Sequence, residues 1–458
     1  MKHLSLTTAM FAMLAATPLA AQNRIDGQSP DAPELAAYGE YTVGVRQFDV
    51  VNPNQIDIKA IDAASPSAPL PTYDRPLTFE MWYPAATDSI GASSFNTYLR
   101  DGITEITLEG RAIRDATPPA ASPSFPLVIL SHGYPGNRFL MSHLAENLAS
   151  KGYVVASIDH TDSTYNDQGA FASTLVNRSL DQKFVLNEIA KINGDSSQDL
   201  AGMIDTDNTA LIGYSMGGYG TVVTAGGGLS EGALGFAPGG ALDIHAEGSE
   251  THDALPDPRI KTAVAIGPWG MNYNLWDAAG LAGIEIPMLF MAGSDDTVSG
   301  YENGVRKIWE GATSVDRALL TFDGGGHNTV APIPAPEESY AAGVSNHYTD
   351  DVWDTVFMNN VGQHFITAWL NKELKGESVM DKYLELTANG SDGIWSVDDA
   401  GNFTGDHTYW AGFAEGTANG IRYETLSAQP APVPLPAAAW MLVLAIGGLG
   451  VMGKRRNA

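Results

Sequence analysis

Runs of β-branched and other apolar residues alternate with amphipathic stretches through the middle of this 458-residue chain. Several runs are continuously apolar, which is typical of strands buried on both faces of a sheet. Parallel strands need a long crossover between them, usually a helix. The alternation therefore predicts an α/β fold with a mostly parallel central sheet and helices on both faces. The predicted strands are Leu77–Tyr83, Leu127–Ser131, Tyr153–Asp159, Ala210–Tyr214, Ile260–Ile266, Pro287–Ala292 and Ala318–Phe322.

Three segments outside these strands have the spacing of amphipathic helices. They are marked by Leu140, Leu144 and Leu148, by Val185, Ile189 and Ile192, and by the stretch Val352–Leu374. Gly152 stands where the first helix should end, because glycine readily adopts the left-handed conformation of a helix terminus. Earlier in the chain, Glu40–Val51 alternates like an edge strand of an antiparallel extension to the sheet.

One domain, residues 22–428, accounts for most of the chain, and two of its segments fall outside the alternating pattern. The Gly/Ala-rich insert 226–257 is too long for an ordinary connection, so it is either a lid over a pocket or a surface loop. Ala388–Ser427 follows the last predicted helix and contains Trp395, Trp410 and Phe413. Such aromatic content predicts that this segment packs on the domain.

Residues 1–21 have the layout of a secretory signal peptide. A charged start is followed by an apolar run from Ala9 to Leu19 and by small residues at Ala20 and Ala21. The run is too short to cross about 30 Å of hydrocarbon as a helix. We therefore expect export of the protein, with cleavage just after Ala21.

The C-terminal segment 429–458 combines a Pro-rich linker, an apolar block at 437–453 and a basic tail. The block is at the short limit for a membrane span of about 17–25 residues, and the basic tail would stay cytoplasmic. Val433–Ala437 reads VPLPA, and with the block and tail it resembles the exosortase-type sorting signals of Gram-negative bacteria, the VPLPA variety of the PEP-CTERM class. The resemblance implies a transient inner-membrane anchor, a sorting enzyme that processes the tail, and display on or release from the cell surface. A plain single-span anchor is the alternative.

The charge balance excludes one class of partner. The chain has 53 acidic and 25 basic residues, for a formal net charge of −28. Such a field repels phosphate backbones, so we exclude a nucleic-acid-binding function. The chain contains no cysteine, which excludes disulfides, thiolate nucleophiles and cysteine-ligated zinc. We expect no metal and no organic cofactor.

A candidate nucleophile lies where a predicted strand gives way to a helix. The sequence Gly213-Tyr214-Ser215-Met216-Gly217 follows the strand Ala210–Tyr214 and precedes the helix-compatible run Tyr219–Ala225. In a G-x-S-x-G motif of this kind the serine sits on a sharp, strained turn, which requires small residues two positions before and after it. The positive end of the following helix also favours developing negative charge.

A serine needs a base, and the base needs an acid that orients it. Asp295 and Asp296 follow the strand Pro287–Ala292, and His327 follows the strand Ala318–Phe322. The carboxyl ends of parallel strands lie at one edge of a sheet, so these residues should meet Ser215 there. We favour Asp296 over Asp295, because the acid must reach His327 from the tip of its loop. We expect Asp323 to be a turn residue at the end of its strand.

Two backbone N–H groups should complete the site. A tetrahedral intermediate needs one donor from the residue after the nucleophile and one from an earlier strand-to-helix loop. Met216 is the first candidate. Tyr134 is the second, because it lies in the small-residue loop after the buried strand Leu127–Ser131.

Four motifs together resemble the α/β-hydrolase superfamily, and within it the dienelactone hydrolase and platelet-activating-factor acetylhydrolase group, which neighbours bacterial cutinases and polyester hydrolases. They are Ser131-His132-Gly133, Gly213–Gly218, Gly293–Val298 and Gly325–His327, within a resemblance that spans roughly Leu77 to Leu386. It implies a serine esterase with Ser215 as nucleophile, His327 as base, Asp296 as orienting acid, and Tyr134 and Met216 as oxyanion donors. The chain departs from dienelactone hydrolases proper, whose nucleophile is cysteine, and from secreted cutinases, which usually carry a disulfide.

The sequence indicates the type of reaction more closely than it indicates the substrate. We expect a small-molecule or polymeric carboxylic ester, cleaved through an acyl-enzyme. Trp269 follows the strand Ile260–Ile266 and either lines a substrate groove or packs as a core or rim aromatic. Two alternatives to a general esterase are a polyester- or lipid-specific hydrolase and a non-catalytic surface protein that keeps the scaffold.

Overall fold

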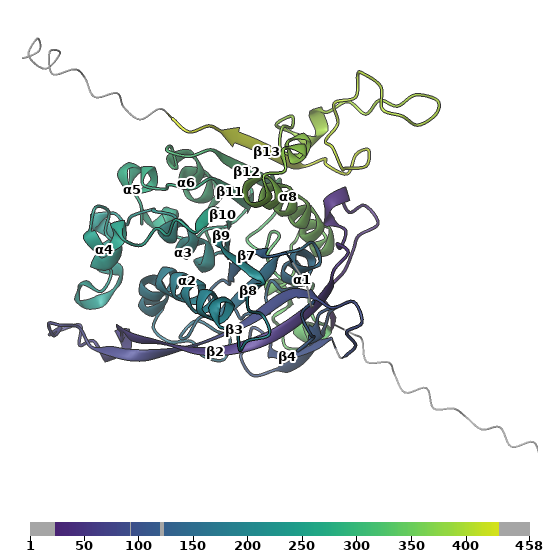
Figure 1. Cartoon of the computed structure of the whole chain (residues 1–458). Coiled ribbons are helices and arrows are strands. Elements are labelled where there is room, and N and C mark those ends of the chain that lie inside the picture. Colours follow the sequence, from purple (N-terminus) through teal and green to yellow (C-terminus); the bar gives the residue numbers. More distant parts are fainter. Residues whose placement is uncertain (1–22, 92, 120–122, 430–458) are drawn as a thin grey trace, which may run out of the picture.

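The computed structural model describes residues 23–91, 93–119 and 123–429, and a ten-stranded sheet runs through this part of the chain (Figure 1). Its strands, in spatial order, are β13 (Ile421–Leu426), β12 (Arg317–Phe322), β11 (Met288–Gly293), β10 (Ile260–Ile266), β9 (Ile204–Tyr214), β7 (Phe125–Ser131), β8 (Val154–Asp159), β3 (Thr72–Ala85), β2 (Thr42–Ile56) and β6 (Ile113–Arg114). The six strands from β12 to β8 are parallel. The strands β13, β3 and β2 extend the sheet by antiparallel pairing.

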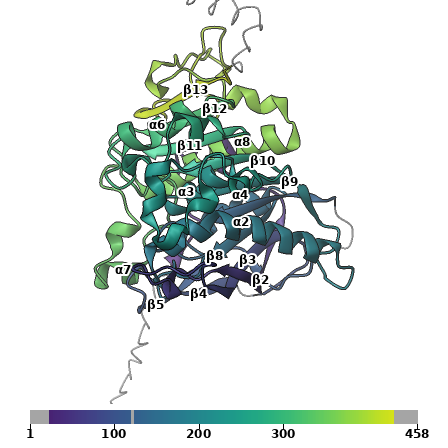
Figure 2. The same cartoon turned by 90° about the vertical axis from the view of Figure 1, so that its left-hand side faces the viewer.

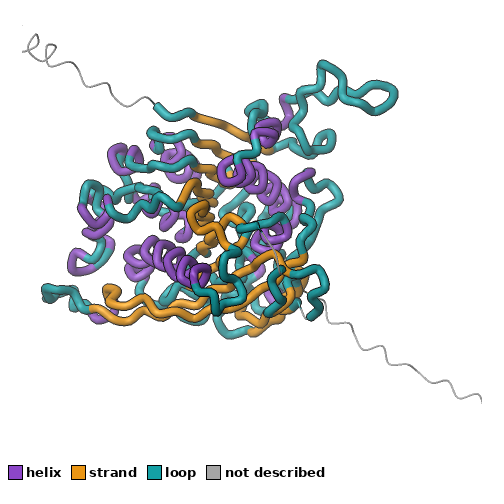
Figure 3. Tube along the Cα trace, in the orientation of Figure 1, coloured by secondary structure: helices purple, strands orange, loops and turns teal. Residues whose placement is uncertain are grey.

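Helices cover both faces of this sheet, as Figures 1 and 3 show. Helices α1 (Ser142–Ser150) and α8 (Thr355–Lys375) pack on one face, and α2 (Phe171–Gly194), α3 (Met216–Thr224) and α6 (Arg306–Gly311) pack on the other, which faces the viewer in Figure 2. Alternate residues of β7 enter the two cores: Val128 and Leu130 one, Leu127 and Ile129 the other. Both faces must be apolar because both are covered, which explains the continuous apolar runs.

The predicted mostly parallel α/β fold is confirmed, and every predicted strand is present. The strands β3 and β9 begin at Thr72 and Ile204, earlier than the predicted Leu77 and Ala210. The antiparallel extension is also confirmed, since β2 pairs with β3 from Thr42 to Ile56. The two-residue strand β6 pairs with the outer side of β2, so β2 is not the outermost strand. The sequence pattern did not predict β13, nor the small second sheet of β1 (Asn23–Arg24), β5 (Glu105–Glu109) and β4 (Ser94–Tyr98).

The segment after α8 packs on the domain, as predicted. Trp410 and Phe413 are buried in the same core as α8, and Trp395 packs against it from a half-buried position. The remaining short helices are α4 (Glu250–Asp253), α5 (Ala278–Ala282) and α7 (Glu337–Ala341). The expected signal peptide at 1–21 and the apolar block and tail beyond residue 429 lie outside the described residues. Within the described residues, no helix combines the length and apolar character needed to span a membrane.

The insert 226–257 folds into short helical turns that end with α4. His245 is buried and anchors the insert to α2, because its Nε2 atom lies 2.8 Å from the carbonyl oxygen of Val176. His252 is also buried and joins the two ends of the insert, because its Nε2 atom lies 3.1 Å from the carbonyl oxygen of Gly226. Lys183 of α2 donates to the carbonyl oxygen of Leu255 near the end of the insert. The insert is thus attached to the helical layer beside α2.

A buried carboxyl group on α1 should make stability depend on pH. Glu146 is fully buried and accepts the backbone N–H groups of Arg111 and Ala112, at 2.8 and 3.0 Å. Burial raises the pKa of Glu146 from 4.5 to about 7, and those two hydrogen bonds only partly oppose the rise. Between these pH values the folded protein holds a proton that the unfolded chain releases, so stability falls as the pH rises through this window.

We therefore expect the wild type to lose about 3 kcal/mol of unfolding free energy relative to Glu146→Gln between about pH 5 and pH 8. Chemical denaturation of both proteins across this range measures the difference. A gap between the two proteins that stays constant with pH would show that Glu146 is ionised in the folded state throughout.

Candidate active site

Ser215 occupies a sharp turn between β9 and α3. Its backbone angles are φ 53° and ψ −113°, a conformation that a non-glycine residue keeps only when its surroundings impose it. The backbone N–H of Ser215 donates to the carbonyl oxygen of Ile266 in β10 at 2.9 Å. A Cβ atom at Gly217 would lie 1.8 Å from the carbonyl oxygen of Ser131, so only glycine lets the turn approach the end of β7. The predicted strand–turn–helix setting is present.

His327 lies in the loop after β12 and contacts both predicted partners. Its Nε2 atom is 2.9 Å from Oγ of Ser215, and its Nδ1 atom is 2.8 Å from Oδ2 of Asp296. The ring also packs against Tyr214, with centroids 5.1 Å apart. The three residues follow β9, β11 and β12, whose carboxyl ends are aligned by the register of the parallel sheet. They therefore form one continuous hydrogen-bonded chain.

Asp296, and not Asp295, supplies the carboxylate. Asp296 is 5% exposed, and its Oδ1 atom accepts the backbone N–H groups of Val298 and Ser299 at 2.8 and 2.9 Å. Asp295 is exposed, and among the described residues its side chain accepts a hydrogen bond only from Ser294. Asp323 forms an ion pair with Arg422 at 2.7 Å, outside the site. The side chains of Asp295 and Asp296 point to different sides of the turn, and only that of Asp296 faces His327.

The electrostatics keep the Asp296 carboxylate ionised. Burial acts to raise the pKa of Asp296, but the hydrogen bond and charge of His327, together with two backbone N–H groups, lower it below 3.8 overall. A charged Asp296 accepts the Nδ1–H of His327 and leaves Nε2 free to accept the proton of Ser215.

Both predicted oxyanion donors lie beside Ser215. Met216 is the first residue of α3, where backbone N–H groups have no partner within the helix. Tyr134 lies in the loop after β7 and lines the same cavity as Ser215 and His327. Neither backbone N–H donates a hydrogen bond to any other described residue. Two free N–H groups beside a nucleophile are what an oxyanion requires.

The site opens into a cavity of about 450 Å³. One wall is polar and charged, and neither the motifs nor the spacing of the sequence pointed to it. It contains Arg100, Asn328, Asn346, His347, Thr349, Asp350 and Asp351. No residue of the insert 226–257, all of which is described, lines this cavity.

Trp269 belongs to a run of aromatic side chains that starts at the cavity. Its ring packs against Phe171 and Tyr273, with centroids 5.3 and 4.8 Å apart, and its backbone N–H donates to the carbonyl oxygen of Ser215. Phe171 in turn contacts Tyr134, and Tyr273 contacts Phe236 of the insert. We call these five residues the aromatic strip. Trp269 itself does not line the cavity, and its role in substrate binding stays a prediction.

The described residues contain no group of three or more His, Asp or Glu side chains that could hold a metal ion.

Known proteins share part of this sequence. The family described as PET hydrolase-like matches residues 114–241, a range that includes Tyr134, Ser215 and Met216 and ends before Asp296 and His327. The fold is that of the α/β hydrolases. The family match covers Tyr134, Ser215 and Met216, and the geometry of the structure adds Asp296 and His327 independently.

Several curated proteins are similar to part of this chain. Cutinase 2 of Thermobifida cellulosilytica is 27% identical over 210 residues, which cover 46% of this chain and 63% of that protein. Cutinase cut1 of Thermobifida fusca is 27% identical over 46% of this chain and 51% of that protein. Platelet-activating factor acetylhydrolase of Cavia porcellus is 27% identical over 41% of this chain and 52% of that protein. The chain thus spans about half to three-fifths of the length of these relatives.

Among solved structures, a ferulic acid esterase from Streptomyces cinnamoneus superposes with a TM-score of 0.49 at 20% identity, over 79% of this chain and 96% of that one.

Proposed function

We propose that this protein is a serine hydrolase that cleaves carboxylic esters through an acyl-enzyme. The observation that carries the proposal is the continuous hydrogen-bonded chain from Oγ of Ser215 through His327 to Asp296. Next to it are two backbone N–H groups that have no partner in the described part of the chain. A histidine within hydrogen-bond reach of a serine, itself oriented by a carboxylate, is the general requirement for activating a hydroxyl nucleophile. The relatives named as cutinases and as an acetylhydrolase support ester bonds as the target.

The first half of the reaction acylates the serine. Nε2 of His327 accepts the proton of Ser215 as Oγ bonds to the ester carbonyl carbon, and the carbonyl electron pair moves onto its oxygen. The N–H groups of Tyr134 and Met216 hold that oxyanion. When the carbonyl re-forms, the bond to the alcohol oxygen breaks, and the alcohol leaves with the proton from Nε2.

The second half releases the acid. A water molecule gives its proton to Nε2 of His327 and bonds to the acyl carbon, which forms a second oxyanion in the same position. Collapse of this intermediate breaks the bond to Oγ, and Ser215 recovers its proton. Asp296 holds the imidazole in the required tautomer and stabilises its cation in both halves.

Hydrolysis of short-chain and long-chain p-nitrophenyl esters by the purified protein tests the proposal. Turnover of at least one ester supports it, and the preference for chain length measures the reach of the acyl site. A folded protein that turns over none of them, and does not react with a fluorophosphonate at Ser215, would instead favour a non-catalytic surface protein on this scaffold.

A polyester or other extended ester is the narrower candidate for the substrate. The aromatic strip extends from Tyr134 at the cavity to Tyr273 and Phe236, which are 51% and 42% exposed. Exposed aromatic rings in a row can hold a chain longer than the cavity itself. The family description and the cutinase names agree with such a substrate. Release of acid from a polyester film by the wild type but not by Tyr273→Ala, with unchanged turnover of p-nitrophenyl acetate, would support it.

The polar wall of the cavity contains one cation, Arg100, that can bind an anionic substrate, beside the two acids Asp350 and Asp351. Its Nη1 atom donates to the carbonyl oxygen of Pro135 at 2.8 Å, and among the described residues no carboxylate lies within ion-pair distance of it. Asp350 lines the same wall, but its two oxygens accept the backbone N–H groups of Gly326 and Val352. The free donors of Arg100 can therefore receive a carboxylate of the substrate.

We expect Arg100→Gln to lower kcat/KM about tenfold for the mono-p-nitrophenyl ester of adipic acid, because a hydrogen bond to a charged group is lost. For p-nitrophenyl hexanoate, which has the same length and no carboxylate, kcat/KM should change less than about twofold. An equal loss with both esters would show that Arg100 only supports the loop at Pro135.

We further propose that the protein is exported by a Gram-negative bacterium and passes through a transient membrane anchor. The basis is the sequence of residues 1–21 and of the VPLPA segment with its apolar block, and the partner implied is a sorting enzyme that acts on residues 429–458. The intact mass of the protein recovered from the cell surface or the medium tests both ends, since an unprocessed chain would exclude both signals.

A further inference from the structure

Arg178 of α2 is a buried cation without a carboxylate partner. It is 1% exposed in a chain where nine of the twelve described arginines form ion pairs, the exceptions being Arg100, Arg178 and Arg317. Its guanidinium instead donates to the carbonyl oxygens of His132 and Gly133, at 2.8 and 3.4 Å, and to Oγ of Ser163 at 2.5 Å. Burying a cation costs free energy. The hydrogen bonds of Nη1 and Nη2 offset part of that cost, whereas Nε of Arg178 is buried with no partner among the described residues.

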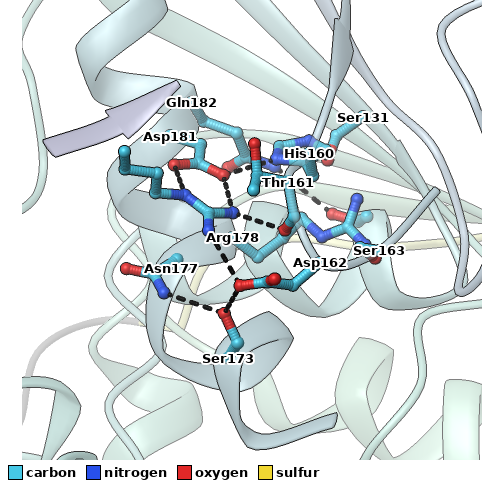
Figure 4. A network of polar contacts seen from close by, with 12 residues as sticks. Ser131, His160, Thr161, Asp162, Ser163, Ser173, Asn177, Arg178, Asp181 and Gln182 are labelled. Atoms are coloured by element: carbon cyan, nitrogen blue, oxygen red, sulfur yellow. Dashed lines mark hydrogen bonds and ion pairs between the residues drawn. The ribbon is translucent and has the colours of Figure 1, made fainter. Parts of the chain in front are cut away.

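The nearby acids are occupied by other cations. Asp181 accepts two hydrogen bonds from Arg75, both at 2.9 Å. It also contacts Nδ1 of His160, whose Nε2 contacts Ser131 (Figure 4). Asp162 forms ion pairs with Lys59 and Arg75. Burial, with the charge of Arg178, lowers the pKa of His160 to about 3, so this ring adds no charge near neutral pH. Among the described residues, the guanidinium of Arg178 therefore donates only to neutral acceptors.

The two carbonyl groups that Arg178 holds belong to the loop that carries Tyr134. In a trans peptide the C=O of one residue and the N–H of the next point in opposite directions. The peptide between Gly133 and Tyr134 is trans, and its oxygen faces Arg178 and Nδ1 of His132. The N–H of Tyr134 must then point away from α2, towards the cavity with Ser215.

The aliphatic part of the Arg178 side chain packs against α3, the helix that follows Ser215. A Cβ atom on Gly220 of α3 would lie 2.4 Å from Cγ of Arg178. The arginine side chain therefore crosses α3 at a glycine, one turn after Met216, before it reaches the loop. One side chain thus links α2, the helix that follows Ser215 and the loop that carries the second oxyanion donor.

We propose that Arg178 is a positioning residue of the oxyanion hole: its guanidinium holds the carbonyl groups of His132 and Gly133 so that the N–H of Tyr134 faces the reacting carbonyl. This inference rests on the proposed esterase function. The same hydrogen bonds polarise the peptide and leave a positive charge behind the donor, which favours the oxyanion more than the neutral ester. The contribution therefore belongs to the transition state.

Substitution of Arg178 by Met tests this, because Met fills the space of the stem over Gly220 and removes every donor. We expect kcat for p-nitrophenyl butyrate to fall about 30-fold or more, up to the roughly 10²- to 10³-fold loss of a deleted oxyanion donor, with KM changed less than about threefold. Binding of phenylboronic acid, whose tetrahedral adduct with Ser215 places an oxygen in the hole, should weaken by a similar factor. Arg178→Lys, which retains the charge and one donor, should recover part of kcat.

Arg317→Met is the matched control. Arg317 is 3% exposed, forms no ion pair and donates only to backbone carbonyl groups, but it lies on β12 away from the loop. Its loss should lower the melting temperature and leave kcat within about twofold of the wild type. If Arg178→Met and Arg317→Met lose equal kcat for equal loss of stability, the positioning role is overturned.

Two further comparisons complete the test. If Arg178→Met does not fold, Arg178→Lys decides: kcat at least about fivefold below the wild type at unchanged KM supports the proposal, and wild-type kcat overturns it. Ser215→Ala is measured in parallel. An active Ser215→Ala protein would refute the esterase function itself, whereas an inactive Ser215→Ala beside a fully active Arg178→Met would refute only the role of Arg178.

Discussion

Ser215→Ala should lower kcat for p-nitrophenyl esters by about 10⁴- to 10⁶-fold. The variant keeps His327, Asp296 and both N–H donors but has no oxygen to bond to the acyl carbon, so no acyl-enzyme forms. The residual rate would reflect water attacking a bound and polarised ester. Alanine fits the turn, because the strain at φ 53° comes from the Cβ atom, which serine and alanine both have. The melting temperature should therefore stay within a few degrees of the wild type.

Stopped assays of both proteins, with titration by a fluorophosphonate, measure this effect. Ser314→Ala is a suitable control, since Ser314 is exposed and its Oγ donates only to the carbonyl oxygen of Ala282. The control should keep full activity and react with one equivalent of the reagent. Equal activity of Ser215→Ala and the wild type would mean that another residue is the nucleophile.

Asp296→Asn should lower kcat by about 10⁴-fold. The two backbone N–H groups of Val298 and Ser299 require an acceptor at the Oδ1 position, so the carbonyl oxygen of the new amide should take that place. Its NH₂ group would then face Nδ1 of His327. A ring that accepts at Nδ1 carries its proton on Nε2, and it can no longer accept the proton of Ser215.

Asp295→Asn is the matched control, one residue away in the same loop. Asp295 is exposed and its side chain does not reach His327, so kcat should remain within about twofold of the wild type. Steady-state kinetics of the two variants show which of the two neighbouring acids orients His327. A large loss in Asp295→Asn with an active Asp296→Asn would reverse the assignment.

The pattern of the sequence was sufficient for the fold and for the order of the site. Apolar runs such as Leu127–Ser131 must be buried on both faces, and parallel strands bring their carboxyl ends to one edge. Ser215, Asp296 and His327 follow three such strands, so their meeting depended only on local motifs and sheet topology. The need for glycines around Ser215 was also predictable, because the sharp turn at the serine requires small residues two positions before and after it.

Other features depended on segments far apart in the chain. The strand β13 was not predicted, because a short, half-exposed edge strand has no continuous apolar run and pairs with a partner about a hundred residues earlier. The aromatic strip joins rings from the loop after β7, α2, the loop after β10 and the insert, and no spacing relates those four segments.

By itself, the sequence of this protein determined the parallel part of the sheet, its helical layers and the chemical identity of the hydroxyl, imidazole and carboxylate groups. Only the tertiary structure decided that Asp296 rather than Asp295 faces His327, that Arg100 lines the cavity, and that Arg178 holds the loop of Tyr134. The reason is physical. Periodicity and strand order follow from interactions along the chain, whereas the direction of one side chain on a loop follows from atoms that only packing brings near it.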